Sequence, residues 1–385
     1  MTELMDTGNL TKNACLLLKK IISIPSCTFE EANVADYLYE YLQNISRAAS
    51  NVFKVIRIAN NIVAIPSGYN KNNATLMLNA HIDTVKPAES YTINPFEAIE
   101  KEGIIYGLGS NDDGASVVAL TQAFIYCNAD TEDNPPYKDS SGPNVILVLS
   151  AEEERSGCNG ISKVLEDLPL YGVSVDFAII GEPTGMKAAV AERGLLVIDG
   201  TAKGVSGHAA RDEGENALYK AIEDINILRN YRFTKKSPLM GDVKLTVTQI
   251  NAGTVHNVVP DKCTFVVDIR PTEQYTNAEI LELLQNVTSS ELVARNLKNR
   301  SSATPQSHEL IHAVKTCGIE TFISPTTSDW MRLGSIPAIK IGPGDSARSH
   351  KADEFIHIAE IEKGIAIYIK LIETIKLTRS LKSQE

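Results

Sequence analysis

Residues 75–84 read Thr-Leu-Met-Leu-Asn-Ala-His-Ile-Asp-Thr, and this stretch decides the fold class. Its first half is a continuous apolar run, which is typical of a strand buried on both faces of a sheet. Its second half carries polar residues just beyond that strand, where the loops of an open α/β sheet build active sites. An extended chain has a period of two, so His81 and Asp83 lie on the same side. The stretch therefore predicts a buried strand that ends at a functional site.

Further apolar runs of the same kind lie on both sides of this stretch, at residues 52–58, 62–65, 145–150, 177–180 and 336–341. Helical patterns alternate with several of them: residues 11–22, residues 30–45, a helix after Gly114, a helix after Gly157, and a long amphipathic helix at 358–377. Strands that alternate with helices are the signature of an α/β domain.

The texture changes between residues 194 and 300. Strands are expected at 195–203, 244–250, 263–269 and 292–297, and helices at 216–228 and 277–287. A β-α-β-β-α-β order is typical of a self-contained ferredoxin-like unit. We therefore expect a discontinuous α/β catalytic domain (residues 1–193 and 301–385) that is interrupted by an inserted α+β domain (residues 194–300).

Composition excludes several classes of function. The 385 residues carry a formal net charge of -11, which argues against nucleic acid as the main partner because phosphate binding needs a basic surface. No apolar run is long enough to span a membrane, and the N-terminus lacks the basic and apolar regions of a signal peptide. The six cysteines are scattered without a Cys-x-x-Cys pair, as expected for reduced thiols in a cytoplasmic protein.

Five short stretches carry side chains of the metal-ligand type at or just beyond predicted strand ends: 79–84, 107–114, 150–154, 181–184 and 349–354. Each is weak evidence alone, because a run of glutamates is usually a solvated surface. Together they place acidic groups at the mouths of buried strands, which is costly unless a cation balances them. Two Zn²⁺ ions would balance one hydroxide and three carboxylates, with two neutral histidines completing the set: Asp112, Glu154, Glu182, His81 and His350. Asp83 is placed to accept the second N–H of His81 and so to fix its tautomer.

With these motifs in order along the whole chain, the sequence resembles the co-catalytic zinc aminoacylase and exopeptidase family. That family includes acetylornithine deacetylase, succinyl-diaminopimelate desuccinylase and related di- and tripeptidases, and the first of these branches is the most similar. The resemblance implies two Zn²⁺ ions, for which Co²⁺ or Mn²⁺ can substitute.

The resemblance also implies a role for each residue of the expected metal site. It assigns His81 and Glu182 to one zinc, Glu154 and His350 to the other, and Asp112 to the bridge between them. Glu153 aligns with the general base of the family, and Asp83 aligns with the residue that orients the histidine. Since Glu152, Glu153 and Glu154 are consecutive, the base could be miscounted by one; Glu152 matches the acidic residue that precedes the family's pair.

The resemblance extends to the inserted domain. Residues 204–209, Gly-Val-Ser-Gly-His-Ala, are similar to the family segment whose histidine, here His208, reaches the active site of the partner subunit. This implies a homodimer formed through the inserted domain. Asn257 looks like the family's polar substrate contact. Arg270 and Arg348 are two candidates for binding a substrate carboxylate, because a guanidinium matches a carboxylate bidentately, although either could form an ordinary surface ion pair.

The expected reaction is hydrolysis of the amide bond of a small N-acyl amino acid. N-acetylornithine, or a closely related N-acyl-ornithine or N-acyl-citrulline, is the favoured substrate, which suggests arginine biosynthesis. Succinyl-diaminopimelate desuccinylase, a zinc di- or tripeptidase, and a non-catalytic binding relative are the alternatives. His308-Glu309-Leu310-Ile311-His312 also matches the His-Glu-x-x-His pattern of single-zinc proteases, although no third ligand is evident. One departure is Gly114, where many relatives carry lysine.

Overall fold

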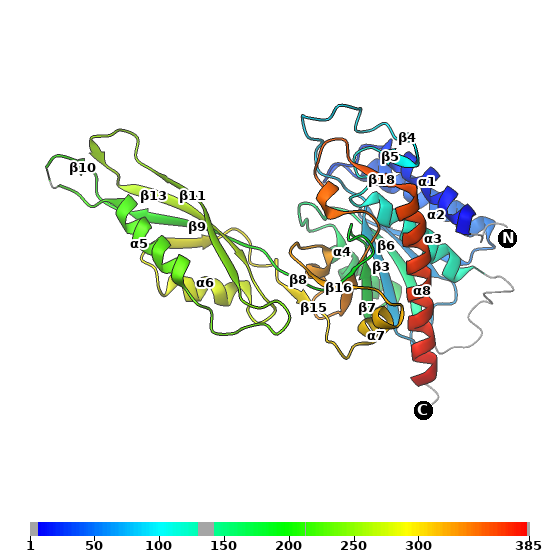
Figure 1. Cartoon of the computed structure of the whole chain (residues 1–385). Coiled ribbons are helices and arrows are strands. Elements are labelled where there is room, and N and C mark those ends of the chain that lie inside the picture. Colours follow the sequence, from blue (N-terminus) through cyan, green and yellow to red (C-terminus); the bar gives the residue numbers. More distant parts are fainter. Residues whose placement is uncertain (1–6, 130–141, 212, 383–385) are drawn as a thin grey trace. The chain divides into compact units, whose positions relative to one another are not determined.

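The computed structural model describes residues 7–129, 142–211 and 213–382, and the chain divides into two compact units (Figure 1). Unit 1 comprises Met1–Val190, Thr304–Phe322 and Ser328–Glu385, and unit 2 comprises Ala191–Ala303 and Ile323–Thr327. The second segment of unit 2, Ile323–Thr327, lies outside the single continuous insertion expected from the sequence.

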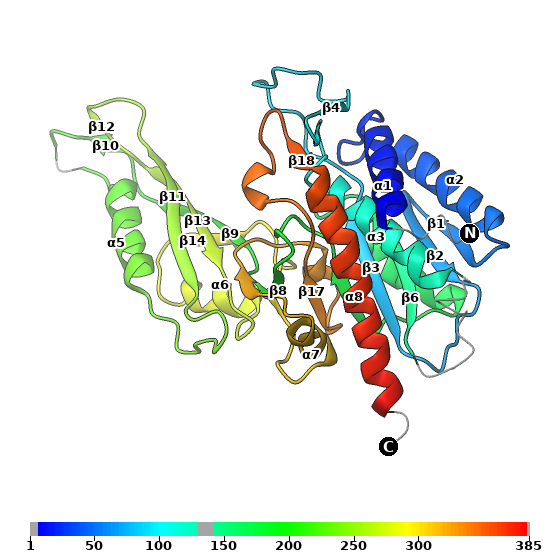
Figure 2. The same ribbon diagram turned by 45° about the vertical axis from the view of Figure 1, so that its right-hand side comes forward.

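A mixed sheet forms the centre of unit 1, with the order β1-β2-β6-β3-β7-β17-β8 (Figures 1 and 2). The strands are β1 (Phe53–Ile58), β2 (Asn61–Pro66), β3 (Thr75–His81), β6 (Asn144–Ser150), β7 (Phe177–Ile180), β8 (Ala188–Glu192) and β17 (Ala338–Lys340). The four neighbours β6, β3, β7 and β17 run parallel, so their carboxyl ends meet at one edge. Every residue of β3, β6 and β7 is buried, which explains why these strands are continuously apolar rather than alternating.

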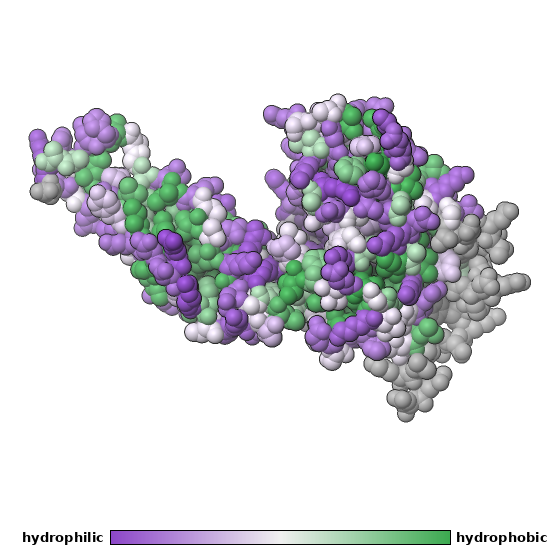
Figure 3. Space-filling view, viewed as in Figure 1, coloured by the Kyte–Doolittle hydropathy of each residue, from purple (hydrophilic) through white to green (hydrophobic). Residues whose placement is uncertain are grey.

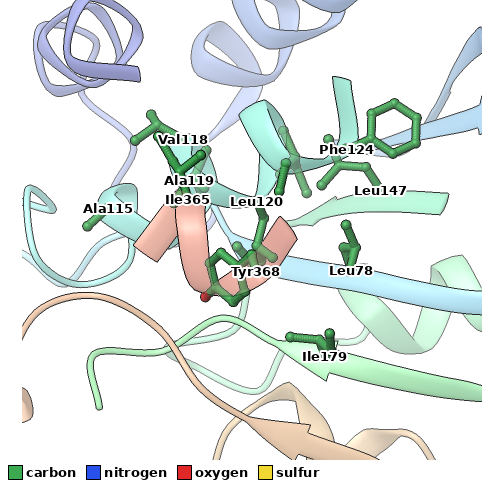
Figure 4. Close-up of a cluster of buried hydrophobic side chains, with 14 of the residues drawn as sticks. Leu78, Ala115, Val118, Ala119, Leu120, Phe124, Leu147, Ile179, Ile365 and Tyr368 are labelled. Atoms are coloured by element: carbon green, nitrogen blue, oxygen red, sulfur yellow. The ribbon is translucent and has the colours of Figure 1, made fainter. Parts of the chain in front are cut away.

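Helices cover both faces of this sheet. The helices of unit 1 are α1 (Thr7–Ile22), α2 (Ala32–Ala48), α3 (Gly114–Asn128), α4 (Ile161–Asp167), α7 (Glu309–Thr316) and α8 (Ile358–Lys382). The larger core joins β3, β6 and β7 to α3 and α8, with Leu78, Phe124, Leu147 and Tyr368 among its side chains (Figure 4). Since α3 is buried on nearly all sides, its sequence is apolar all round and shows no amphipathic stripe. The other face packs on α4 and on the short helices η2 (Leu168–Tyr171) and η3 (Asp329–Arg332).

A second, small sheet in unit 1 was not expected. It has the order β18-β5-β4 and joins β4 (Ile99–Lys101), β5 (Ile104–Tyr106) and β18 (Phe355–His357). Strands of three residues are too short to show a period of two, so the sequence pattern does not reveal them. The short helix η4 (Ser346–Arg348) precedes β18.

Unit 2 confirms the ferredoxin-like order. Its elements are β9 (Leu196–Lys203), α5 (Ala217–Asn230), β11 (Lys244–Ala252), β13 (Lys262–Arg270), α6 (Asn277–Gln285) and β14 (Glu291–Ala294). The strands pair antiparallel in the order β11-β13-β9-β14, and their buried residues pack under α5 and α6 around Phe265. The Phe265 ring lies over Gly200, where an added Cβ would come within 2.3 Å of it. Of the remaining described strands, β10 (Gly207–His208) and β12 (Val258–Val259) pair with each other, and β15 (Ser302–Ala303) and β16 (Thr321–Ser324) both pair with β8 of the mixed sheet.

Candidate metal centre and active site

The parallel strands bring four of the expected ligand segments to one edge of the sheet. His81 is the last residue of β3, and the neighbouring strand β6 ends at Ser150, directly opposite it. Glu154 follows β6, Glu182 follows β7, and the chain after β17 leads to His350. Because the carboxyl ends of parallel strands share an edge, residues far apart in the sequence meet there.

The side chains of this edge lie within metal-ligand reach of one another. His81 Nε2 is 3.2 Å from Asp112 Oδ1, and His350 Nε2 is 3.1 Å from Glu154 Oε1 and 3.8 Å from Asp112 Oδ2. Asp112 thus presents one oxygen to each histidine, as a bridging ligand would. Ligand atoms of two groups each lie within 4.8 Å of one another: His81, Asp112 and Glu154, and His81, Glu153 and Glu182.

The electrostatics of the cluster fit divalent cations. Burial raises the pKa of Glu153 well above its usual value, and the charges of Glu182 and Asp329 add to this effect. Burial likewise raises the pKa of Glu182, although the nearby Lys340 opposes the shift. Buried carboxylates that destabilise one another's charged forms gain most from a cation between them. The oxygen and imidazole donors suit zinc, cobalt or manganese.

The carboxylate of Asp83 contacts the glutamate loop more closely than it contacts His81. His81 Nδ1 lies 2.9 Å from the backbone oxygen of Asp83 and 3.6 Å from its carboxylate, so the backbone carbonyl takes the nearer place at the imidazole. The fully buried carboxylate instead accepts hydrogen bonds from the backbone N–H of Glu153 (3.0 Å) and Glu154 (3.2 Å), and from Thr28 Oγ1 (2.9 Å). Asp83 therefore positions both the expected base and an expected ligand.

The three consecutive glutamates, Glu152, Glu153 and Glu154, differ in the groups that their side chains contact. The Glu152 carboxylate accepts hydrogen bonds from the backbone N–H (2.9 Å) and side-chain amide (3.0 Å) of Asn159, so it closes its own loop. Gly157 packs against it, since an added Cβ would come within 2.0 Å of Glu152 Oε2. Glu153 and Glu154 are left to approach the metal cluster, which supports counting the base as Glu153.

A profile of peptidase family M20/M25/M40 matches residues 77–374, which include all of these segments. The chain belongs to this family. The succinyl-diaminopimelate desuccinylase of Dechloromonas aromatica is 30% identical over 383 residues, covering 93% of this chain and 97% of the relative. A putative [LysW]-lysine/[LysW]-ornithine hydrolase of Pyrobaculum aerophilum is 27% identical over 365 residues, covering 93% and 94%. The fold is similar to that of a dinuclear metal-binding M20 peptidase from Bacillus subtilis, with a TM-score of 0.68, a sequence identity of 15%, and coverage of 97% of this chain and 99% of that chain.

Membership of the M20/M25/M40 family, together with this side-chain cluster, identifies the chain as a metal-dependent amidohydrolase. In the part of the chain that the structure describes, no helix is both long enough and apolar enough to cross a bilayer.

Gly114, the departure from many relatives, has a steric reason in this member of the family. It begins α3 directly after Asp113, and its N–H donates to the carbonyl of Gly109 at 2.9 Å. An added Cβ would lie 2.4 Å from that carbonyl oxygen and 2.8 Å from Leu18. The close approach of two backbone segments therefore excludes a side chain, lysine included, in this conformation.

Unit 2 brings two of its expected functional residues together. His208 on β10 pairs with Val258 on β12, and the N–H of Ala209 donates to the carbonyl of Asn257 at 3.0 Å. His208 and Asn257 are both exposed at this two-stranded ribbon. Their roles stay predictions.

Both candidate arginines bind carboxylates of this chain. Arg270 binds Asp268 with Nε and an Nη, at 2.8 and 3.1 Å. Arg348 binds Glu360 at 2.7 and 3.2 Å and lies 4.6 Å from the centre of the Phe355 ring. Both arginines therefore form ion pairs within this chain, and a role for either of them in binding a substrate carboxylate stays a prediction.

The His-Glu-x-x-His segment has a local structural role. His308 is the N-cap of α7: its Nδ1 accepts from the N–H of Leu310 at 3.2 Å, and its ring lies 5.9 Å from that of Phe177. Among the described residues, no group of three candidate ligands forms around His308 and His312. Nothing in the structure therefore favours the single-zinc protease.

Two buried acidic residues beside the site were not among the expected catalytic, metal-binding or substrate-binding residues. Glu31 is fully buried, and its Oε1 accepts from the backbone N–H of Phe29 (2.7 Å) and of Glu152 (3.3 Å). Asp329 accepts a hydrogen bond from Ser150 at 2.6 Å beside the end of β6. Because such residues bind the backbone or a hydroxyl far away in the sequence, their spacing carries no signal.

Proposed function

We propose that this chain hydrolyses the amide bond of an N-acyl amino acid with two zinc ions, held by the residues His81, Asp112, Glu154, Glu182 and His350. The observation that carries the proposal is the convergence of these donors at one sheet edge, beside the half-buried Glu153. When bound, the metal ions supply Lewis acidity that lowers the pKa of a water molecule and polarises the amide carbonyl.

Glu153 is the general base in this proposal. It takes a proton from the attacking water and returns it to the leaving amine. Its raised pKa, caused by burial and by neighbouring carboxylates, favours this return of the proton. The Asp83 carboxylate accepts a hydrogen bond from the backbone N–H of Glu153 and so fixes the position of the Glu153 backbone, from which the catalytic side chain extends. His208 is proposed to reach the active site of the partner subunit and to support the developing oxyanion there, and Asn257 is proposed to contact the substrate.

The proposed substrate class is an N-acylated diamino acid. The two relatives above are named for diaminopimelate and for lysine and ornithine derivatives, all of which are diamino acids. N-acetylornithine belongs to this class, and a closely related N-acyl-ornithine or N-acyl-citrulline is the next candidate, so a role in arginine biosynthesis is part of the proposal. The desuccinylase reaction on succinyl-diaminopimelate is the second candidate, favoured by the names of several relatives.

The test is hydrolysis of a substrate panel by the purified protein, with chelator or with added Zn²⁺. The panel contains N-acetylornithine, N-acetylcitrulline, N-succinylornithine, succinyl-diaminopimelate and a tripeptide. Chelator-sensitive release of the amino acid from one acyl compound supports the proposal and selects the acyl group. Cleavage of the tripeptide alone, or metal binding without hydrolysis of any compound, contradicts it.

We further propose a homodimer formed through unit 2. Strand β11 lies at the edge of the described sheet, and its Ile250 side chain is exposed. The helix α5, which packs against β11, exposes Tyr219, Ile222 and Ile227, and apolar surface is visible in this region of unit 2 (Figure 3). Unpaired edge strands and exposed apolar side chains are features of protein interfaces.

Sedimentation of the purified protein tests the homodimer. The wild type is expected at twice the monomer mass, and a Ile250→Lys, Ile222→Lys variant is expected as a monomer. A wild type that sediments as a monomer at concentrations used for the assay would contradict the proposal.

A further inference from the structure

A buried carboxylate, which is not one of the expected metal ligands, connects the loop that carries Asp112 to the loop that carries His350. Glu354 is 2% exposed, and its Oε1 accepts hydrogen bonds from the backbone N–H of Asn111 and of Asp112, both at 2.8 Å. Its Oε2 accepts a third from the N–H of Gly109 at 3.0 Å. A single side chain thus binds three backbone donors of the loop that presents the expected bridging ligand.

The Asn111 side chain makes a matching set of contacts in the opposite direction. Its Oδ1 accepts from the backbone N–H of Asp345 (2.9 Å), and its Nδ2 donates to the carbonyl of Asp345 (3.1 Å). A longer contact joins Nδ2 to Ser349 Oγ at 3.5 Å, directly before His350. Asn111 is fully buried, and its amide fits only because residue 344 is glycine: an added Cβ there would lie 2.4 Å from Asn111 Oδ1.

The small sheet continues this connection away from the metal centre. β5 ends at Tyr106 and β18 begins at Phe355, and these two residues are paired. The N–H of Gly107 donates to the carbonyl of Glu354 at 3.0 Å, which extends the pairing to the first residue of the Asp112 loop. The two loops therefore leave the same pair of strands and are held together again beside the metal ligands.

These contacts differ from those that hold the other ligands. His81 is part of a central strand, and Glu182 directly follows another, so the sheet itself fixes them. Asp112 and His350 instead lie in loops that are not paired with a strand at these two positions. Their separation is therefore set by the Glu354 and Asn111 contacts.

We propose that Glu354, together with Asn111, is a positioning residue for the metal centre: it sets the spacing of Asp112 and His350 and thereby the affinity for the metal ion that these two residues share. The inference rests on the proposed two-metal function. It predicts that Glu354 governs metal binding without contacting substrate. Residues that orient metal ligands typically contribute about 10–100-fold to metal affinity.

The test measures metal binding directly, by competition with a chromophoric chelator and by the absorption spectrum of the Co²⁺-loaded protein. In Glu354→Ala, the metal ion held by Glu154 and His350 is expected to bind about 10–100-fold more weakly, whereas the ion held by His81 and Glu182, which shares only the bridging Asp112 with the displaced loops, should weaken less. Glu354→Gln retains an acceptor oxygen and should lie between the alanine variant and wild type. With excess metal, kcat should recover and KM should match wild type, which a general loss of structure would not produce.

Asp353→Asn is the matched control. Asp353 is the neighbouring carboxylate on the same loop, but it accepts hydrogen bonds from the hydroxyl and the backbone N–H of Thr92, at 2.7 and 2.9 Å, instead of from the Asp112 loop. The Asp353→Asn variant is expected to bind both metal ions with wild-type affinity. If Glu354→Ala does not fold, Glu354→Gln and Asn111→Ala carry the measurement.

The outcomes separate this proposal from the proposed function. Wild-type affinity for both metals in Glu354→Ala, or in both substitute variants, overturns the positioning role and leaves the two-metal function standing. A wild-type protein that binds no divalent metal overturns the proposed function itself. Selective weakening of one metal, absent in Asp353→Asn, supports the positioning role.

Discussion

Replacing Asp83 by asparagine tests how the site is held in place. The carboxylate is fully buried and accepts the N–H groups of Glu153 and Glu154. An asparagine amide has nearly the same shape but offers only one oxygen, so its NH₂ group must face one of these two N–H donors. One charge-assisted hydrogen bond is lost, and one buried donor is left unsatisfied.

The magnitude follows from these two contacts. A hydrogen bond to a charged group contributes about 1.5–3 kcal/mol, and an unsatisfied buried donor adds a penalty, so unit 1 should lose about 2–4 kcal/mol of stability. Displacement of Glu153 should lower kcat about 100-fold, because small errors in the position of a catalytic group have effects of this size. KM should change little, since Asp83 makes no contact with substrate in the proposed mechanism.

The assay uses the single tryptophan of the chain. Trp330 is buried in unit 1, so its fluorescence during urea denaturation reports on that unit. Chelator in all samples removes the contribution of metal binding to stability. Asp176→Asn is the control: this exposed carboxylate accepts the N–H of Thr75 at 2.8 Å, at the opposite end of β3. This control substitution should lower the free energy of unfolding by less than about 1 kcal/mol. An Asp83→Asn variant with kcat within about twofold of wild type would refute the reasoning.

Three further predictions concern other parts of the molecule. Gly114→Ala should destabilise unit 1 by about 1–3 kcal/mol or more and lower activity, because its Cβ would lie 2.4 Å from a backbone oxygen; a urea midpoint equal to wild type would contradict this. Zinc binding should release protons near neutral pH, since burial raises the pKa values of Glu153 and Glu182 in the metal-free protein. Metal affinity should therefore fall as pH falls; calorimetric heats that do not depend on the ionisation enthalpy of the buffer would argue against it. In unit 2, the backbone of Thr276 lowers the pKa of Glu279 to about 2, so its capping contribution to α6 is complete above the ordinary glutamate pKa and is lost as pH falls towards about 2. The difference in melting temperature between wild type and Glu279→Gln should accordingly shrink between about pH 5 and pH 3, and a constant difference would exclude this cause.

The elements with strong periodicity could be predicted from the sequence, and the short ones could not. The buried run that became β3 and the β-α-β-β-α-β order of unit 2 were both recognised. The sheet β18-β5-β4 was missed because strands of three residues have no measurable period. The mixed sheet order also depends on pairings between distant strands, such as β17 beside β7, that hydropathy does not encode.

The candidate site divides in the same way. Ligand types at strand ends can be read from a sequence, since the strand and the side chain are adjacent along the chain. Glu354 lay inside one of the quoted stretches but had no predicted role, because its partners are backbone N–H groups more than 240 positions away. Every residue except proline has such a donor, so the sequence cannot indicate which ones are used. The Arg270–Asp268 pair, by contrast, follows from a period of two on β13.

Asp83 and Glu354 solve the same physical problem at two places. A loop that presents a metal ligand has unpaired N–H groups, and the site is too buried for water to satisfy them all. A buried carboxylate can accept several of these donors at once, and a charged acceptor binds them more strongly than a neutral one. Each carboxylate is itself stabilised by the donors that it orders. The expected loop ligands Glu154 and Asp112 thereby acquire a defined position in the metal-free protein, comparable to that which the sheet gives to His81 and Glu182. On this reasoning the polypeptide sets the shape of the proposed metal site before any metal binds, and Asp83 and Glu354 are expected to affect metal affinity without contacting a metal ion themselves.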